Sequence, residues 1–308
     1  MSDTLVSLRR KIGGAGDLES VVRSMKALAA SSIGQYEKSV LALADYYRTV
    51  ELGLAVCLRK RGVAPAEQAG ETDTAAKTVN AIVFGSDQGL VGQFNDVLTD
   101  FVAKSLDPLP GEKNVWAVGE RVHSRLTDAG LVPVGLFAVP TSVNAITPLV
   151  GQILLESEAC HGKGEDVQLY IFHNRPKPGA AYEPVSQLLL PLDEKWGLRL
   201  AKLPWPTANL PEIIGGQEQT LAALVREYLF VSLYKASAES LASENASRLA
   251  AMQRAEKNID EMVGNLNQTF RRLRQTSIDE ELFDVLSGYE SLTKNKNAPA
   301  LTHAPSTR

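Results

Sequence analysis

The stretch of this chain that is best suited to chemistry is a glycine-rich turn, Gly85-Ser86-Asp87-Gln88-Gly89-Leu90-Val91-Gly92. It follows a short apolar run and precedes a helical pattern, the setting in which amides at a helix N-terminus bind a phosphate. Its glycine spacing is neither GxGxxG nor that of a P-loop, which would end in GK[ST]. A tight turn that needs positive φ explains the same glycines. The sequence therefore favours a structural turn or a protein contact at Asp87, Gly89 and Gly92, with a ligand site as the alternative.

The other residues that could do chemistry form no recognisable site. No two histidines have the i,i+4 spacing of a metal pair, no nucleophile elbow is present, and the paired acids Glu280-Glu281 lie on a charged helical pattern. The sequence therefore predicts no catalytic residue, no metal and no cofactor. Surface or loop positions are expected for the four histidines, which are His123, His161, His173 and His303.

Composition limits the classes of function further. The chain has 308 residues, 44% of them hydrophobic and 22% charged, and a net charge of −4. A negative balance argues against nucleic-acid binding, because such domains usually carry a basic excess. Only two cysteines occur, far apart at Cys57 and Cys160, which favours a reducing compartment. No apolar run approaches the roughly 20 residues that span a bilayer, so any membrane association is expected to be indirect, through a partner.

The turn belongs to a segment, residues 79–210, in which short apolar strands alternate with helices of ordinary length. This alternation predicts right-handed βαβ crossovers and a Rossmann-like α/β domain with a mostly parallel five-stranded sheet. No helical pattern separates the last two strands, so we expect them to pair antiparallel at one edge. The expected strands are 79–84, 115–118, 134–139, 167–172 and 185–190, and the expected helices are 92–105, 119–129 and 144–159.

Two long helical patterns flank this domain. Apolar or small residues recur every 3.5 residues through 3–60 and through 221–286, which is the period of a left-handed coiled coil. We therefore expect the two helices to pair antiparallel, with Gly13, Gly14 and Gly16 causing a fray or bend in the first. A helix over the second pattern is about 100 Å long, more than a domain of this size contains. The predicted division is 1–60 (coiled-coil helix), 61–78 (linker), 79–210 (α/β domain), 211–290 (coiled-coil helix) and 291–308 (disordered tail).

Both helical patterns carry basic clusters. One comprises Arg9, Arg10, Lys11 and Arg23, and the other comprises Arg271, Arg272 and Arg274. In an antiparallel pair these two groups need not coincide. Each cluster is either a solvated face or a polar track that an acidic partner recognises.

Four segments, in order along the chain, resemble the gamma subunit of F-type ATP synthases. Ser24-Met25-Lys26-Ala27-Leu28-Ala29-Ala30-Ser31 resembles that family's AMKMVAASK, and Ser86–Asn95 resembles SDRGLCGGFN. Ser243–Met252 resembles SEHAARMVAM, and Arg274–Leu282 with Ser287-Gly288 resembles RQAxITxEL followed by SGA. The resemblance covers about residues 3–292, and its departures from the family pattern suggest a divergent bacterial or archaeal branch.

The resemblance implies a central rotor shaft that catalyses nothing itself and couples ion flow through the membrane ring to the catalytic beta subunits. Its implied partners are a ring of alpha and beta subunits, the epsilon subunit with delta as a further candidate, and the membrane c-ring. It also implies a peripheral protein on the cytoplasmic face of a prokaryotic membrane. By resemblance, Met25 and Lys26 face the beta subunits, and Arg248 and Gln275 contact the ring. Asp279 stands where the family usually has threonine at such a contact.

Two alternatives remain open at this point. One is a small nucleotide-binding enzyme with helical arms, which requires a ligand at Gly85–Gly92. The other is a scaffold whose long helices pair between two copies of the chain.

Overall fold

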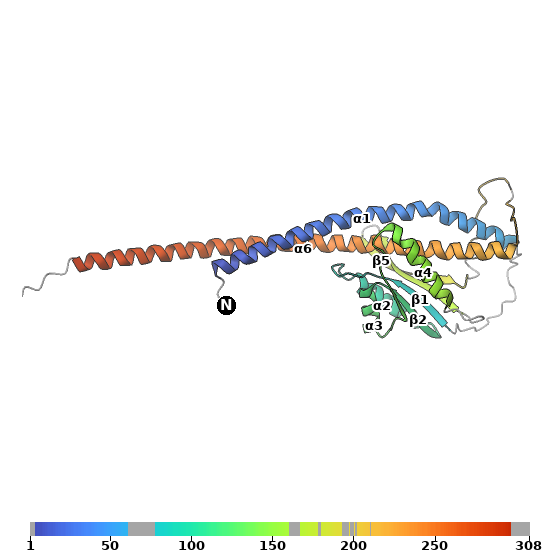
Figure 1. Cartoon of the computed structure of the whole chain (residues 1–308), viewed down its shortest axis with the longest axis horizontal. Helices are drawn as coiled ribbons and strands as arrows, with labels where there is room; N and C mark the ends of the chain where they lie inside the picture. Colours follow the sequence, from blue (N-terminus) through green and yellow to red (C-terminus); the bar gives the residue numbers. More distant parts are fainter. Residues whose placement is uncertain are drawn as a thin grey trace, which may run out of the picture. The chain divides into compact units, whose positions relative to one another are not determined.

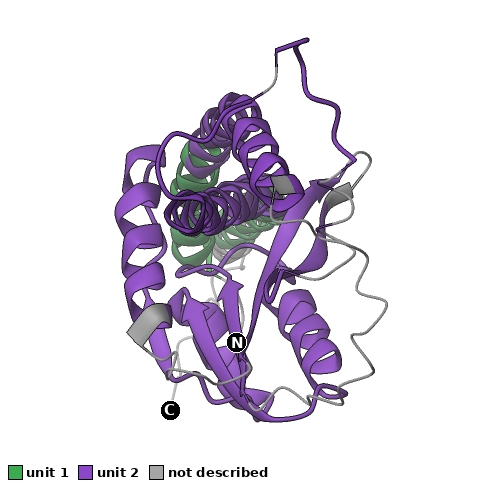
Figure 2. Ribbon diagram, turned by 90° about the vertical axis from the view of Figure 1, so that its right-hand side faces the viewer, with its two compact units in different colours: residues 1–24, 254–308 green, residues 25–253 purple. Residues whose placement is uncertain are grey.

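The computed structural model describes residues 4–60, 78–159, 167–177, 180–192, 197, 200, 202–209 and 211–296. The chain forms two compact units, unit 1 from residues 1–24 and 254–308 and unit 2 from residues 25–253 (Figure 2). Two long helices, α1 (Leu5–Lys60) and α6 (Gln217–Lys296), contribute to both units (Figure 1). Among the described residues, no helix is long and apolar enough to cross a membrane.

The α/β part of unit 2 is built on a five-stranded sheet with the strand order β3-β2-β1-β4-β5. The central strand β1 (Thr78–Phe84) runs parallel to both β2 (Glu112–Val118) and β4 (Val167–Lys177), and β3 (Gly135–Phe137) runs parallel to β2. β5 (Ala180–Leu190) pairs antiparallel with β4. The predicted mostly parallel five-stranded sheet with one antiparallel edge is therefore confirmed.

Helices cover both faces of this sheet because alternate side chains of its strands point to opposite sides. Val79, Ala81 and Val83 of β1 pack with α2 (Phe94–Leu106) and α3 (Glu120–Asp128). Ile82 and Phe84 of the same strand pack on the other face, with α4 and the long helices. α4 spans Ile146–Ala159 and follows a short 3-10 turn, η1, at Val143–Ala145.

Within unit 2 the two long helices pair antiparallel. Tyr46 of α1 donates its hydroxyl to Glu227 Oε2 of α6 at 2.6 Å. Farther along α1, the carbonyl of Cys57 accepts from Gln217 Nε2 at 3.2 Å. The two helices therefore run in opposite directions, as expected from the two helical patterns with a period of 3.5 residues.

The parts of α1 and α6 in unit 1 also pair antiparallel. Arg23 Nε lies 4.0 Å from Glu256 Oε1, and Arg9 lies over the ring of Phe270 at 5.8 Å. The fray expected at Gly13, Gly14 and Gly16 is wrong, because α1 is one continuous helix from Leu5 to Lys60, while a bend there stays a prediction. Leu8, before the glycines, and Ala15, between Gly14 and Gly16, are both buried. Such tertiary burial outweighs a penalty of about 1 kcal/mol per glycine.

The predicted segment boundaries stay predictions. Helix α6 begins at Gln217 and runs to Lys296, whereas the sequence pattern placed the helical segment at 211–290. The predicted linker at 61–78 lies outside the described residues except for Thr78, which begins β1. Of the predicted tail, 297–308 also lies outside them.

Candidate functional site

The glycine-rich turn is held in place by hydrogen bonds from the protein itself. The backbone N–H of Ser86 donates to Asn95 Oδ1 at 3.1 Å, and Asn95 Nδ2 donates to Ser86 Oγ at 2.8 Å. The carbonyl of Ser86 accepts from the N–H of Arg121 at 3.0 Å. Because Ser86 and Asn95 are both buried, these bonds satisfy groups that would otherwise be costly to bury. The amide of Ser86 is therefore already occupied and does not point at a ligand.

Asp87 joins the turn to two further elements. Its Oδ1 accepts the N–H of Glu120, the first residue of α3, at 2.9 Å, and its Oδ2 accepts the N–H of Val139 at 3.0 Å. A carboxylate at a helix N-terminus is favoured by the helix dipole and by the unpaired amides there. The side chain of Asp87 therefore satisfies the first amide of α3 and ties the turn to that helix, which supports a structural role for the turn.

The glycines of the turn have different tasks. Gly92 has φ of 60°, so the expected positive φ occurs there. Gly89 packs beside the guanidinium of Arg121, and a Cβ at Gly89 would lie 3.4 Å from its Nη2. Leu90 also has positive φ, at 64°, although it is not glycine and its side chain is 61% exposed. A residue other than glycine in this conformation is strained and is often found where a surface makes a contact.

We predict that Asp87→Asn lowers the free energy of unfolding by about 1–3 kcal/mol. The asparagine keeps one acceptor oxygen, so its NH₂ group must face the N–H of either Glu120 or Val139. Asp96→Asn is the matched control, because the contact of Asp96 found within the described residues is an exposed ion pair with Arg125 at 2.9 Å. Its loss should stay below about 1 kcal/mol. Urea unfolding of the full chain measures both values, and equal losses would contradict the proposed role of Asp87.

Asp87 and Gln88 also line a hollow of about 230 Å³ between the turn and the long helices. From α6, Arg248 Nη2 donates to Glu244 Oε1 at 2.6 Å within the hollow. The side chain of Arg248 is only 13% exposed. Tyr36 of α1 completes the polar lining. The structure thus brings Asp87 and Arg248 to one hollow within unit 2.

Burial dominates the ionisation of Glu244. Removal from water raises the pKa of the Glu244 carboxyl and outweighs the opposing effect of Arg248, while nearby Asp87 raises it slightly more. A carboxyl whose pKa is raised in the folded chain binds its proton more tightly there than in the unfolded chain. It therefore contributes stability below its ordinary pKa of 4.5, and that contribution is lost as pH rises through the raised value.

We predict that Glu244→Gln removes this pH dependence. Relative to the variant, the unmodified chain should lose unfolding free energy as pH rises above 4.5, and the difference should level off once Glu244 is ionised. Each pH unit between the folded and unfolded pKa is worth about 1.4 kcal/mol. Unfolding curves from pH 4.5 to pH 8 measure the effect. Parallel stability profiles for the two proteins would contradict the raised pKa.

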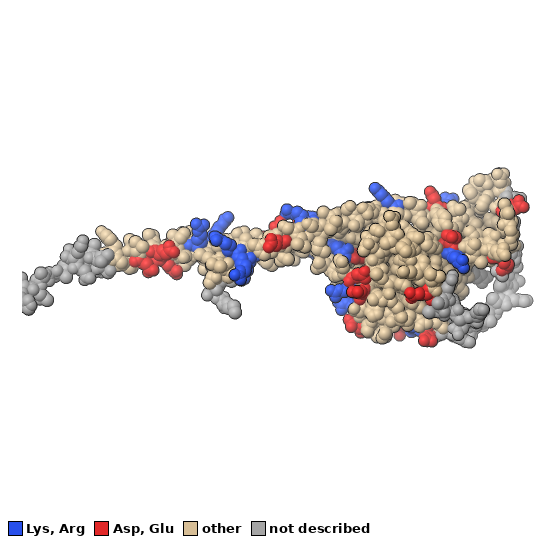
Figure 3. Space-filling model, viewed as in Figure 1, with Lys and Arg blue, Asp and Glu red and all other residues tan. Residues whose placement is uncertain are grey.

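Unit 1 carries a different kind of surface, dense in positive charge. Because Arg9 of α1 lies over Phe270 of α6, residues 9–11 lie at the same level of the helix pair as the cluster at residues 271–274. Arg23, the remaining member of the first cluster, lies apart from them beside Glu256, so the two clusters coincide only in part. Lys and Arg gather on this part of the helices in Figure 3. The exposed residues Arg9, Arg10, Lys11, Arg271, Arg272 and Arg274 are here called the basic collar.

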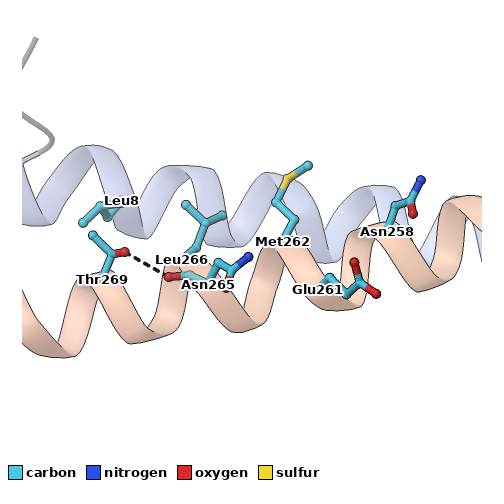
Figure 4. Close-up of a pocket in the computed structure, with 7 residues that line it drawn as sticks. All are labelled: Leu8, Asn258, Glu261, Met262, Asn265, Leu266 and Thr269. Carbon is cyan, nitrogen blue, oxygen red and sulfur yellow. Dashed lines mark hydrogen bonds between the residues drawn. The ribbon is translucent and has the colours of Figure 1, made fainter.

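Beside the collar, unit 1 contains an open groove of about 400 Å³ (Figure 4). Leu8 from α1 and Met262 and Leu266 from α6 supply its apolar part. Polar side chains along α6 line the remainder, and Thr269 donates its hydroxyl to the carbonyl of Asn265 at 3.0 Å. The other lining residues are Asn258 and Glu261.

The C-terminal part of α6 exposes large apolar side chains. Six of them lie within three turns of helix, and all are exposed in unit 1. A soluble protein rarely leaves so many large apolar groups close together in water unless they contact a partner. The six are Ile278, Leu282, Phe283, Val285, Leu286 and Tyr289, here called the apolar end.

Comparison with known proteins assigns this chain to a family. A family model described as ATP synthase matches residues 4–292. The ATP synthase gamma chain of Bdellovibrio bacteriovorus is 24% identical over 301 residues, covering 94% of this chain and 99% of that protein. The gamma chain of Anaeromyxobacter dehalogenans is also 24% identical, over 294 residues, with the same coverage. The chain belongs to the ATP synthase gamma family. It is therefore the central-stalk rotor subunit of an ATP synthase and is not itself catalytic, which removes the enzyme and scaffold alternatives.

Solved structures share the fold. The chain matches one from the central stalk and c-ring of the Tetrahymena thermophila mitochondrial ATP synthase with a TM-score of 0.52 and 23% identity, covering 76% of this chain and 99% of that one. It matches one from the OSCP/F1/c-ring assembly of the Euglena gracilis mitochondrial ATP synthase with a TM-score of 0.60 and 15% identity, covering 98% and 99%.

The shaft residues inferred from the family resemblance are divided between the two units. Met25 and Lys26 are half-buried on the part of α1 that belongs to unit 2. Gln275 and Asp279 are exposed on the part of α6 that belongs to unit 1. Arg248 is the one that faces the α/β domain, through the hollow that it shares with Asp87.

The sequence also misjudged one residue and missed others. His173 was expected at the surface or in a loop, but it is buried in β4, and its Nε2 lies 2.8 Å from Glu239 Oε2 of α6. The expectation is wrong because β4 is an interior strand whose end packs under α6. Ser240 and Ser247 of α6 were not singled out either, although both are buried and donate to the β1 region. The signal that could have found them is the run of serines on one face of α6.

Proposed function

We propose that unit 1 is the part of the rotor that a ring of alpha and beta subunits encloses. The observation that carries this proposal is the apolar end, whose large apolar side chains are exposed within the described part of unit 1. Burial of such side chains is worth about 1.5–3 kcal/mol each, so an enclosing apolar sleeve would bind them favourably. The basic collar supports the same proposal, because acidic groups on surrounding subunits would attract it without fixing it in one orientation.

In this proposal the shaft residues make polar contacts with the ring. Gln275 and Asp279 lie on exposed positions next to the apolar end, where a side chain of a surrounding subunit can reach them. Met25 and Lys26 are proposed to face the beta subunits, as in the family. The half-buried position of Arg248 favours a contact that depends on the hollow beside Asp87.

The α/β domain is proposed to contact the epsilon subunit and the c-ring, with delta as a further candidate. Two surface features support a protein contact here. Leu90 projects from the turn in a strained conformation, and the edge of the sheet near β3 exposes Val134 and Leu136. An exposed apolar edge strand is usually covered by a partner. Membrane association is then indirect, on the cytoplasmic face of a prokaryotic cell membrane, consistent with the bacterial relatives.

The proposal is tested by co-expressing the full chain with its cognate alpha, beta and epsilon subunits and isolating the complex through the beta subunit. We predict that Leu282→Asp lowers the amount of chain recovered roughly tenfold, because a buried charge costs more than the 1.4 kcal/mol that one factor of ten represents. Ser287→Asp is the matched control, since it adds the same charge at an exposed polar position of the same helix. Failure of the unmodified chain to co-purify would refute the proposed partners. Equal recovery of both variants would refute the enclosure of the apolar end.

A further inference from the structure

The face of helix α6 that packs on the sheet of unit 2 consists largely of small side chains. Buried serines occur on successive turns of the helix beside buried alanines such as Ala236 and Ala238. Small side chains allow the backbone of a helix to approach a neighbouring element closely, so polar groups on both sides come within hydrogen-bonding distance. The buried serines of this face are Ser232, Ser237, Ser240, Ser243 and Ser247.

Two of these serines bond to the chain at the end of β1. Ser240 Oγ donates to the carbonyl of Phe84, the last residue of β1, at 3.0 Å. Two turns farther along α6, Ser247 Oγ donates to the carbonyl of Val91 in the glycine-rich turn at 2.5 Å. Both bonds are buried and both join residues 156 positions apart in sequence. They therefore fix α6 at two points along its axis, one at the end of the central strand and one in the turn that follows it.

A third link joins α6 to the neighbouring strand. His173 of β4 and Glu239 of α6 approach to 2.8 Å, with side chains only 6% and 12% exposed. A hollow of about 200 Å³ lies beside this link and is lined by Arg175, Lys235 and both members of the pair, among others. Glu239 and Ser240 are consecutive residues of α6. Glu239 contacts β4 and Ser240 bonds to β1, so the helix is joined to both strands at the same point along its axis.

We propose that Glu239, Ser240 and Ser247, with His173, form a torque clamp that locks the α/β domain to the shaft. Apolar contact holds a helix against a sheet but resists rolling of the helix about its own axis only weakly, because the hydrophobic effect is non-directional. Hydrogen bonds are directional, weakening steeply as the angle at the donor falls. Three of them, reaching two strands and separated along the axis, fix both the angle and the register of α6. These are positioning residues, which act through the geometry of the domain and not through contact with a reacting group.

The clamp rests on the proposed contact between the α/β domain and the c-ring. If the domain receives torque from the membrane ring, the torque must pass through the domain–α6 interface before it reaches the rest of α6. Without the clamp the helix can slip against the sheet. ATP hydrolysis would then continue while less of each rotation reaches the membrane ring.

The test uses the complete ATP synthase in lipid vesicles and compares ATP hydrolysis with the membrane potential that hydrolysis generates, followed by a voltage-sensitive dye. For the triple variant Glu239→Ala, Ser240→Ala, Ser247→Ala, we expect hydrolysis within about twofold of the unmodified complex and a potential-generating rate reduced several-fold. The matched control is Ser237→Ala with Ser243→Ala, which removes two equally buried hydroxyls of the same face that bond to no group in the described residues. Its coupling should be unchanged.

Two further measurements keep the outcome decisive. Glu239→Gln retains an oxygen that can accept from His173, whereas Glu239→Met keeps a similar volume without an acceptor. The Gln variant should therefore couple better than the Met variant, a difference that a loss of packing does not explain. If the triple variant fails to fold, the single variants Glu239→Ala and Ser247→Ala are compared in the same assay. Coupling equal to that of the control in these variants would overturn the clamp. A complex that fails to assemble even with the unmodified chain would instead refute the proposed partners.

Discussion

Replacement of Tyr228 by alanine is expected to lower the free energy of unfolding by about 3–5 kcal/mol, one of the two largest effects predicted for any single change in this chain. Tyr228 lies on α6 and is 2% exposed, in the core that joins the long helices to one face of the sheet. Its ring packs with that of Tyr47 of α1 at 6.0 Å, and its hydroxyl accepts from Gln187 of β5 at 3.3 Å. Alanine removes the contacts that Tyr228 makes with α1 and β5. It leaves a cavity between α6, α1 and β5, which these elements cannot fill by moving together.

Unfolding in urea, followed by the fluorescence of Trp116, measures this loss, because Trp116 is buried in the same core. Tyr46→Ala is the matched control at the same level of the helix pair, because Tyr46 directly precedes Tyr47 and its partner Glu227 directly precedes Tyr228. Tyr46 is exposed and its bond to Glu227 is made at the surface, so its loss should be about 1 kcal/mol or less. A comparable loss in both variants would mean that the contact between Tyr228 and Tyr47 does not hold α1 against α6.

The alternation of strand and helix patterns was sufficient to predict the sheet, because a parallel pair needs a helical crossover and a direct hairpin gives an antiparallel one. The extents of the strands were less predictable. β4 and β5 run to Lys177 and from Ala180, well beyond the apolar runs that marked them. The extra length is held by cross-strand ion pairs, in which Glu183 lies 2.6 Å from Arg175 and 2.8 Å from Lys177. Polar residues of this kind give no apolar signal in a sequence.

The candidate site was predictable only in part. The glycine pattern marked the turn, and Asp87 within it, but the N–H groups that Asp87 accepts come from residues 33 and 52 positions away. The family resemblance implied that Arg248 contacts the ring, and it gave no sign of a contact with the turn. Its partner Glu244 lies one turn before it, and the pair is buried because the turn after β1 covers that face of α6. Nothing local in the sequence shows which face of a long helix a distant loop will cover.

Replacement of Gly119 by alanine is the second change with a large expected effect, a loss of about 3 kcal/mol or more in the free energy of unfolding. Gly119 lies between β2 and α3 with φ of 120°, a conformation that residues with a side chain rarely adopt. A Cβ at this position would lie 2.7 Å from the backbone carbon and oxygen of Ser86. Backbone cannot rotate away as a flexible side chain does, and Ser86 is itself held by Asn95 and Arg121.

Gly130→Ala separates the two causes of this loss. Gly130 also has positive φ, at 82°, but a Cβ there would meet nothing within 4 Å. The control therefore reports conformational strain alone, which should cost about 1–2 kcal/mol. The excess loss in Gly119→Ala combines the cost of moving the glycine-rich turn away from α3 with the greater backbone strain at φ of 120°. Equal losses would show that the turn yields freely, and Asp87, which depends on the same approach of the turn to α3, could not then hold the N-terminus of that helix.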